Sequence, residues 1–347
     1  MQTSIFDLVT AKNIVEYFLE KNVNTQPLLG ETLFPNVKEI GIHVEWLKGA
    51  FNQPIALKLS AYDSKATRRN RPGLEKFIGE MPFFKESMYI DEDMRQKLNT
   101  MLQTNNEAVV NSILMKLFDD EINLIKAARI SLERMRMEAL TTGKLTLASN
   151  GQSYTCDYEV PEDQKIDATT KWSDASADII QDILNVVGKM KAKGVTITRA
   201  ICNSSVIKCF TLNESIKNSI YVLAGGSIAS ITPNLAINYI NDMTKVQFLE
   251  YDNVYVDDDG SAVKYVADNT VIFMPDGELG QTHLGTTPEE SDLMTLGTAK
   301  VSLVDNGIAV ATYGTEDPVN VETKVSMVAL PSFERANEIV IFDTEKQ

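Results

Sequence analysis

The chain has 347 residues, of which 44% are hydrophobic and 23% charged, so its composition is that of a globular protein long enough for two domains. The formal net charge is −15, which argues against a surface that neutralises a nucleic-acid backbone. The longest apolar run, 220–231, is about 12 residues, too short for a membrane span, and three cysteines without CxxC spacing favour a reducing compartment.

The first part of the chain predicts an arm followed by a β-hairpin. Residues 1–37 show a short amphipathic helical pattern and then a stretch around two prolines that we expect to be extended. Apolar residues alternate over 40–47 and again over 55–59, so we expect these runs to pair as a hairpin. The segment 63–76 beyond them is highly charged and almost without apolar residues, and therefore cannot pack alone.

One long helix is predicted over 105–142. Apolar residues recur at helical spacing from Val110 to Met135, and Gly143 can adopt the left-handed conformation that ends a helix. Asn105 or Asn106 is the expected cap at its start. Three arginines in its second half are candidates for contacts with a neighbouring molecule: Arg129, Arg134 and Arg136.

Two short alternating runs follow the helix, and Asn150-Gly151 between them predicts a two-residue type I′ hairpin. After a polar linker, Ser173 or Asp174 is the expected cap of a second amphipathic helix. Asn203 is the expected cap of a short helix that follows a buried strand.

The rest of the chain predicts mainly strands. Short alternating or apolar runs separated by turn residues occupy about 221–318, and further alternating runs occur at 321–330 and 338–342. Strands mixed with a few helices predict the α+β class.

The sequence offers few residues for catalysis or metal binding. Its two histidines are His43, in an alternating run, and His283, in a Gly/Thr/Pro-rich stretch that predicts a loop. Neither a phosphate-binding loop nor a dinucleotide fingerprint occurs. The run 257–260 (DDDG) lacks the spread of ligands and the closing Glu of an EF-hand loop, so it predicts a hairpin tip. We therefore expect no catalytic residue, no cofactor and no metal.

Charge is distributed unevenly along the chain. Residues 242–292 contain twelve acidic and two basic residues, whereas 58–76 contain six basic and two acidic ones. Two solvated surfaces would explain this contrast, and so would a contact between the basic segment of one copy and the acidic surface of another. The candidate contact residues are Lys65, Arg68, Arg69, Arg71, Asp257, Asp258 and Asp259.

Several stretches carry a resemblance to a known family: GIHVEW before the charged segment, RRNRPGLEKFIGEMPFFKESMYIDEDM before the long helix, the long helix itself with its exit LTTGKL, Trp172 with the helix over 174–187, and VETKVSMVALPSFERANEIVIFD near the end. With these parts in this order, the chain resembles the lambda-type family of tailed-bacteriophage major capsid proteins. The resemblance is one of pattern and order, without a single signature motif, and it covers nearly the whole chain.

The resemblance implies an α+β, HK97-like capsid fold and an icosahedral shell that encloses phage DNA. It further implies four parts: an N-terminal arm (1–37), an extended loop lying over a neighbouring subunit (38–80), a peripheral domain (81–164 and 319–335) with a spine helix (105–142), and an axial domain (165–318 and 336–347). The protein would be structural, a virion component assembled in the bacterial host cytoplasm, and not an enzyme.

The implied partners are other copies of the chain, in pentamers and hexamers. Because only about 37 residues precede the extended loop, we expect a separate scaffolding protein, together with a portal and possibly a decoration protein. The packaged DNA would be bound without sequence specificity, and no membrane would be involved. One alternative is an encapsulin-like compartment shell; a less favoured one is a cytoplasmic enzyme or ligand-binding α+β protein built on 165–318.

Overall fold

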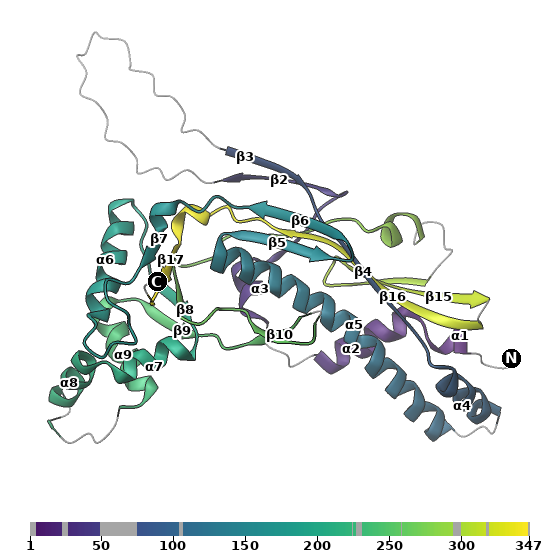
Figure 1. Cartoon of the computed structure of the whole chain (residues 1–347). Coiled ribbons are helices and arrows are strands. Elements are labelled where there is room, and N and C mark those ends of the chain that lie inside the picture. Colours follow the sequence, from purple (N-terminus) through teal and green to yellow (C-terminus); the bar gives the residue numbers. More distant parts are fainter. Residues whose placement is uncertain are drawn as a thin grey trace, which may run out of the picture. The chain divides into compact units, whose positions relative to one another are not determined.

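The structure is a computed structural model that describes residues 5–22, 27–48, 75–103, 107–223, 225–226, 231–257, 259–293, 300–316 and 319–345. The chain forms two compact units, in each of which three separate stretches come together (Figure 1). Unit 1 comprises Met1–Glu45, Ile78–Arg136 and Gln281–Ser332, and unit 2 comprises Trp46–Phe77, Met137–Gly280 and Phe333–Gln347.

Unit 1 begins with three helices, α1 (Ile5–Leu8), α2 (Ala11–Asn22) and α3 (Leu29–Leu33). Helix α2 buries Ile14 and Phe18 and packs against strands β14 (Lys300–Val304) and β15 (Ile308–Glu316). The stretch expected to be extended is helical at α3, which buries Leu33. The arm is therefore an integral part of the core of unit 1.

The sheet of unit 1 is built around the long strand β16 (Val319–Pro331). On one side β16 pairs with β15, which in turn pairs with β14. On its other side, β16 pairs with β4 (Phe83–Tyr89) along residues 322–328 and with β13 (Thr282–Leu284) along residues 329–331. Strand β1 (Asn36–Lys38) runs parallel to β13 and pairs with it. The sequence did not predict β1, β4, β13 or β14.

This sheet differs from the sequence-based division of the chain. The boundary expected between residues 318 and 319 separates β15 from β16, which pair from Ile308↔Met327 to Glu316↔Val319. The strands β13 to β15 therefore belong to the sheet of β16, because main-chain pairing joins them to it. The assignment of peripheral and axial roles in a shell stays a prediction.

The predicted long helix is confirmed as α5 (Glu107–Thr142), preceded by α4 (Glu92–Gln103). Its expected caps, Asn105 and Asn106, lie outside the described residues. Gly143 ends it with φ of +73°, as predicted. A Cβ at this position would lie 2.7 Å from Cγ2 of Val160, so the close approach of the chain also requires glycine.

Strands β2 (His43–Lys48) and β3 (Glu75–Glu80) form a two-stranded ribbon. The predicted partner run, 55–59, lies outside the described residues, and the described partner of β2 is β3. Trp46 stacks on Phe77 with ring centroids 4.0 Å apart, which fixes one face of the ribbon.

Unit 2 contains two further ribbons. Strands β5 (Lys144–Ser149) and β6 (Gln152–Asp157) are joined by Asn150 and Gly151 with φ of 50° and 72°, which confirms the type I′ hairpin prediction. Strands β10 (Val254–Val256) and β11 (Ala262–Lys264) form the other ribbon. The described residues between them are Asp257 and 259–261, which agrees with the predicted hairpin tip at 257–260.

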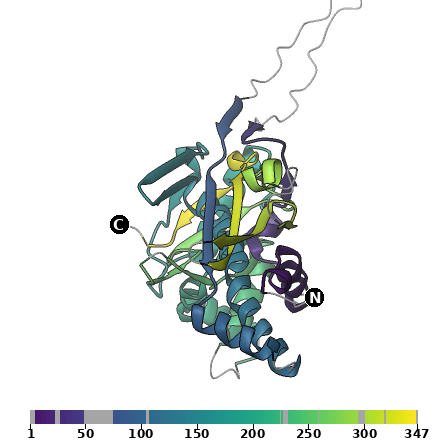
Figure 2. The same cartoon turned by 90° about the vertical axis from the view of Figure 1, so that its right-hand side faces the viewer.

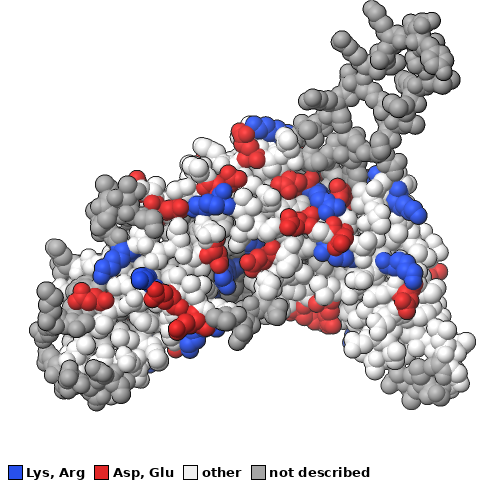
Figure 3. All heavy atoms as spheres, turned by 180° about the vertical axis from the view of Figure 1, so that it is seen from behind, with Lys and Arg blue, Asp and Glu red and all other residues white. Residues whose placement is uncertain are grey.

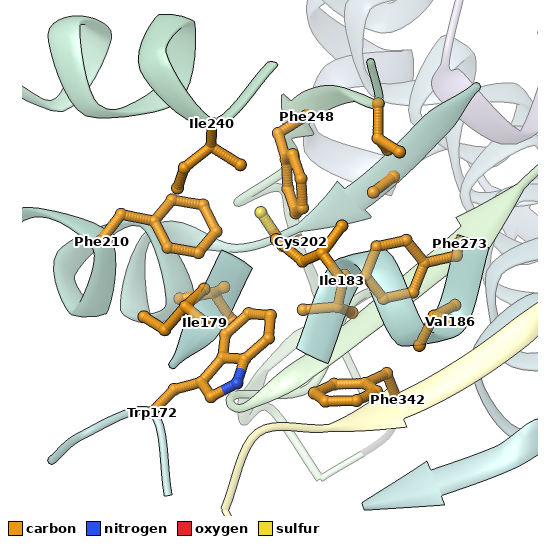
Figure 4. Close-up of a cluster of buried hydrophobic side chains, with 14 of the residues drawn as sticks. Trp172, Ile179, Ile183, Val186, Cys202, Phe210, Ile240, Phe248, Phe273 and Phe342 are labelled. Atoms are coloured by element: carbon orange, nitrogen blue, oxygen red, sulfur yellow. The ribbon is translucent and has the colours of Figure 1, made fainter. Parts of the chain in front are cut away.

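The main sheet of unit 2 contains five strands in the order β7 (Lys165–Asp167), β17 (Val340–Asp343), β12 (Thr270–Met274), β8 (Arg199–Cys202) and β9 (Gln247–Glu250). Helices α6 (Ile179–Ala192), α7 (Ser204–Leu212), α8 (Glu214–Leu223) and α9 (Pro233–Thr244) accompany it. Aromatic side chains fill the core between helices and sheet, among them Trp172, Phe210, Phe273 and Phe342 (Figure 4).

Two helix predictions in unit 2 need correction. Helix α6 is capped by Asp178, whose side chain accepts from the N–H of Gln181, and not by Ser173 or Asp174. Helix α9 lies within the region 221–318 that was predicted to be strand-rich, and α8 ends at the start of that region. The cap Asn203 is confirmed, since its side chain accepts from the N–H groups of Ser205 and Val206.

Short helical turns complete the described chain: η1 (Glu162–Gln164), the π-helical η2 (Glu289–Leu293) and η3 (Ala336–Glu338). None of the described helices has both the length and the apolar content needed to cross a membrane.

Candidate functional site

The predicted contact residues fall on two different parts of the chain. Lys65, Arg68, Arg69, Arg71 and Asp258 lie outside the described residues, while Asp257 and Asp259 lie at the tip of the β10–β11 ribbon. The structure therefore gives the positions of two of the acidic residues, and the contact itself stays a prediction.

Hydrogen bonds within the tip fix its shape. The N–H of Asp257 donates to the carbonyl of Ser261, and Oδ1 of Asp259 accepts from both the N–H (2.8 Å) and the Oγ (2.6 Å) of Ser261. These bonds stabilise the ionised form and lower the pKa of Asp259. The tip therefore presents negative charge beside the exposed valines Val254 and Val256.

The structure places His283 in strand β13 and not in a loop, and it brings a serine and a glutamate to this histidine. Its Nε2 lies 3.1 Å from Oγ of Ser332, and its Nδ1 lies 3.0 Å from Oε1 of Glu39. This is the order of groups in a Ser-His-acid triad. However, Ser332 is 0% exposed, and its Oγ accepts from the N–H of Gln281 and donates to the carbonyl of the same residue.

Hydrolysis requires a substrate carbonyl within reach of the serine oxygen. Because Ser332 and His283 are both buried, the Glu39–His283–Ser332 group is a polar crosslink between chain segments within unit 1. His43 is exposed on β2. Among the described residues, no cluster of His, Cys, Asp or Glu suits a metal ion.

The three cysteines are free thiols, of which Cys156 and Cys202 are buried and Cys209 is half-buried. Burial raises the pKa of Cys156 to about 11 and also raises the pKa of Cys202, so both thiols are held in the protonated, unreactive form at neutral pH.

Two arginines of α5 that were candidates for contacts with a neighbour are used inside unit 1. Arg136 is buried, and its guanidinium donates to Oγ1 of Thr282 (2.8 Å) and to Oδ1 of Asn36 (2.5 Å). Beside it, Glu133 accepts from the N–H of Gly30 at 2.8 Å. These bonds join α5 to α3, β1 and β13.

Arg129 donates through Nε and Nη2 to both carboxylate oxygens of Asp305, and its guanidinium lies over the ring of Phe18 at 4.9 Å. Arg136 is buried and held by internal partners, so the expectation that it contacts another molecule is wrong. The side chain of Arg129 pairs with Asp305 but is 32% exposed, so its contact with another molecule stays a prediction.

Acidic and basic side chains are interspersed on one face of the molecule. On the face in Figure 3, Lys and Arg alternate with Asp and Glu and do not gather into a basic patch. Such a face does not provide the concentrated positive charge that tight binding of a nucleic-acid backbone needs.

Comparison with known proteins identifies the family. A family model described as phage major capsid protein E matches residues 11–344. No curated protein matches the chain.

Solved structures provide an independent comparison of the fold. A prophage protein from Escherichia coli CFT073 that is described as a capsid protein has a TM-score of 0.62 and 17% identity, with 96% of this chain and 99% of that chain covered. A phage-related protein from Bordetella bronchiseptica RB50 has a TM-score of 0.56 and 10% identity, with 97% of each chain covered.

These likenesses agree with the α+β, HK97-like fold implied by the resemblance. The family match covers nearly the whole chain. The chain therefore belongs to the phage major capsid protein E family and is a structural protein of a phage capsid shell.

Proposed function

We propose that copies of the chain assemble into a closed icosahedral shell, made of pentamers and hexamers, that encloses phage DNA. The observation that carries this proposal is the family match over residues 11–344. The similarity of the fold to a prophage capsid protein supports it, although a fold alone does not fix a function.

The charge of the chain suits a container for DNA. A subunit with a net charge of −15 repels the polyphosphate, so DNA driven into the shell is not held tightly by its wall. Strength must then come from many repeated contacts between subunits, because a single exposed ion pair contributes only about 0 to 1 kcal/mol.

The proposal includes partners other than the chain itself. Assembly would take place in the bacterial host cytoplasm with a separate scaffolding protein and a portal, and a decoration protein could bind the finished shell. We also propose that the protein has no enzymatic activity. The burial of the Glu39–His283–Ser332 group supports this, since no substrate can reach Ser332.

The direct test is to express the chain with and without a scaffolding protein and to separate the products by sedimentation. We expect particles far larger than a monomer, and we expect those isolated from phage-producing cells to contain nucleic acid. Particles filled with a protein cargo would favour a compartment shell, and a monomer under all conditions would contradict the proposal.

We further propose that the basic segment containing Lys65, Arg68, Arg69 and Arg71 contacts the tip at Asp257–Asp259 of another copy. The double change Arg68→Glu with Arg71→Glu should leave the subunit folded but slow its assembly, most strongly at low salt. Adding Asp257→Lys and Asp259→Lys should restore part of the rate. Equal assembly rates of the first variant and the unchanged chain at all salt concentrations would contradict this proposed electrostatic contact.

A further inference from the structure

Among the residues that the structure describes, strand β4 has one bonded edge and one open edge. Its pairing with β16 runs from Phe83↔Val328 to Tyr89↔Glu322. Hydrogen bonds flank this stretch, from the N–H of Ala329 to the carbonyl of Pro82 and from the N–H of Ile90 to the carbonyl of Val321. In an antiparallel ladder, bonded and non-bonded pairs alternate.

The even-numbered residues of β4 therefore direct their main-chain groups toward β16. The N–H and C=O groups of the odd-numbered residues point the other way: Phe83, Lys85, Ser87 and Tyr89. They make no main-chain hydrogen bond with any described residue. Figure 2 shows β4 as the long blue strand beside the yellow β16.

The fold treats the β14 edge of this sheet differently. Helix α2 and η2 pack against strand β14, whereas the main described neighbour of β4 is β16. Long exposed edges attract other chains, and monomeric proteins usually blunt them with prolines, bulges or inward charges. Strand β4 pairs regularly over seven residues, and its sequence FFKESMY contains no proline.

Its side chains are also more apolar than a solvent edge requires. Phe83, Met88 and Tyr89 are 43%, 38% and 56% exposed, while Lys85 and Glu86 give the strand no net charge. An added strand would cover these side chains and satisfy the outward main-chain groups together.

We propose that the open edge of β4 pairs antiparallel with β4 of a second copy of this chain, about a two-fold axis, and so forms a continuous sheet between two subunits. This inference rests on the proposed shell function, which requires contacts between copies. A two-fold contact places the same surface on both partners, so the strand must be complementary to itself.

The sequence of β4 meets this requirement at every pair except the central one. With residue 86 on the axis, the odd-numbered residues of the two copies form the hydrogen-bonded pairs. Phe83 then lies opposite Tyr89, and Phe84 lies opposite Met88, which are favourable cross-strand pairs. At the centre, Glu86 lies opposite Glu86 of the second copy, and this pair of like charges is unfavourable.

Residue-resolved hydrogen exchange of free subunits and assembled particles tests the pairing within a single strand. The amides of Phe84, Glu86 and Met88 bond to β16 and should be protected in both states. The amides of Phe83, Lys85, Ser87 and Tyr89 should exchange quickly in the subunit and at least tenfold more slowly in the particle. Particles in which these odd-numbered amides stay fast would overturn the inference and leave the shell function intact.

A substitution at Ser87 provides the second test. Ser87→Pro removes an outward N–H but no bond to β16, so the subunit should fold, while the subunit concentration needed for assembly should rise at least tenfold. Ser87→Ala keeps the N–H and should assemble like the unchanged chain. Normal assembly of a folded Ser87→Pro variant would contradict the pairing.

The two-fold register has its own test. Glu86→Gln removes the like-charge pair and should lower the assembly concentration up to about fivefold at low salt. An unchanged concentration would exclude the β4–β4 register.

Discussion

The two units differ in what they bury. The core of unit 2 is an apolar cluster rich in aromatic rings (Figure 4), and its buried carboxylate, Asp182, accepts from Nε1 of Trp172 (3.0 Å) and Oγ1 of Thr169 (2.8 Å). The interior of unit 1 contains charged side chains from α5, namely Glu121, Glu133 and Arg136.

This difference has consequences for stability. Apolar burial is nondirectional and tolerates small changes in position, whereas a buried charge depends on specific partners and on pH. Unit 2 should therefore respond mainly to changes in side-chain volume, and unit 1 to changes in pairing and protonation. Both tryptophans, Trp46 and Trp172, belong to unit 2, so their fluorescence follows that unit alone.

The largest effect is expected in the core of unit 2. Phe342 is 2% exposed, and its ring lies 5.1 Å from that of Trp172 and 5.9 Å from that of Phe273. Phe342→Ala should lower the free energy of unfolding of unit 2 by about 3 to 5 kcal/mol, measured by tryptophan fluorescence in urea. Phe342→Leu is the milder control, and a loss below about 1 kcal/mol for alanine would show that this cluster is not close-packed.

Loss of the buried contacts of Arg136 should lower the stability of unit 1 almost as strongly. Arg136→Met removes the bonds to Thr282 and Asn36 and leaves Glu133 without the nearby positive charge, which should cost about 3 kcal/mol. Hydrogen exchange of β13 and β16 amides measures the change. Arg95→Met removes an exposed ion pair with Glu92 and should cost much less than Arg136→Met; equal losses would contradict the role of burial.

Protonation of Glu121 should make unit 1 sensitive to pH. This side chain is 3% exposed; Oε1 accepts from Oγ1 of Thr323, and Oε2 has no hydrogen-bond partner among the described residues. Burial raises the pKa of Glu121 to about 7 from its ordinary value of 4.5. The folded state therefore binds this proton more tightly than the unfolded state, and stability falls as the pH rises from about 4.5 to 7.

Glu121→Gln should remove that loss. Relative to the unchanged chain, the variant should gain about 2 to 3 kcal/mol in unit 1 between pH 5 and pH 8. Urea unfolding of dissociated subunits, followed by hydrogen exchange of β16, measures the gain. Glu16→Gln, on the exposed side of α2, controls for the loss of one charge. A variant whose advantage is the same at both pH values would refute the buried-carboxylate explanation.

The smallest effect concerns the start of α6. Asp178→Ala removes the cap on the N–H of Gln181 and should cost unit 2 about 1 kcal/mol, measured by tryptophan fluorescence. Asp178→Asn keeps an acceptor and should recover most of this loss. An unaffected alanine variant would mean that another group caps the helix.

The elements that the sequence predicted correctly are those with strong local signals. Gly143 ends α5, Asn150-Gly151 forms its hairpin, and Asn203 caps α7, because each of these depends on the conformation of one or two residues. Helix α9 also has such a signal, since Thr232 accepts from the N–H of Leu235 and Pro233 begins the helix, but the strand-rich interpretation of the region missed it.

Other features depend on partners distant in the sequence. Strand β4 is largely exposed, and its pairing is decided by β16, more than 230 residues later. The partners of Arg129 and Arg136, such as Asp305 and Thr282, lie 176 and 146 residues away in the sequence, so helical spacing alone could not predict these pairings. The Glu39–His283–Ser332 group is likewise created by the fold.

Electron cryomicroscopy of particles formed by this chain is the most direct test of the central claim that it is a shell subunit. We expect closed icosahedral particles in which every subunit has the two units described above, grouped in pentamers and hexamers. Purified chain that stays monomeric even when a scaffolding protein is present, or that forms only open and irregular aggregates, would contradict that claim.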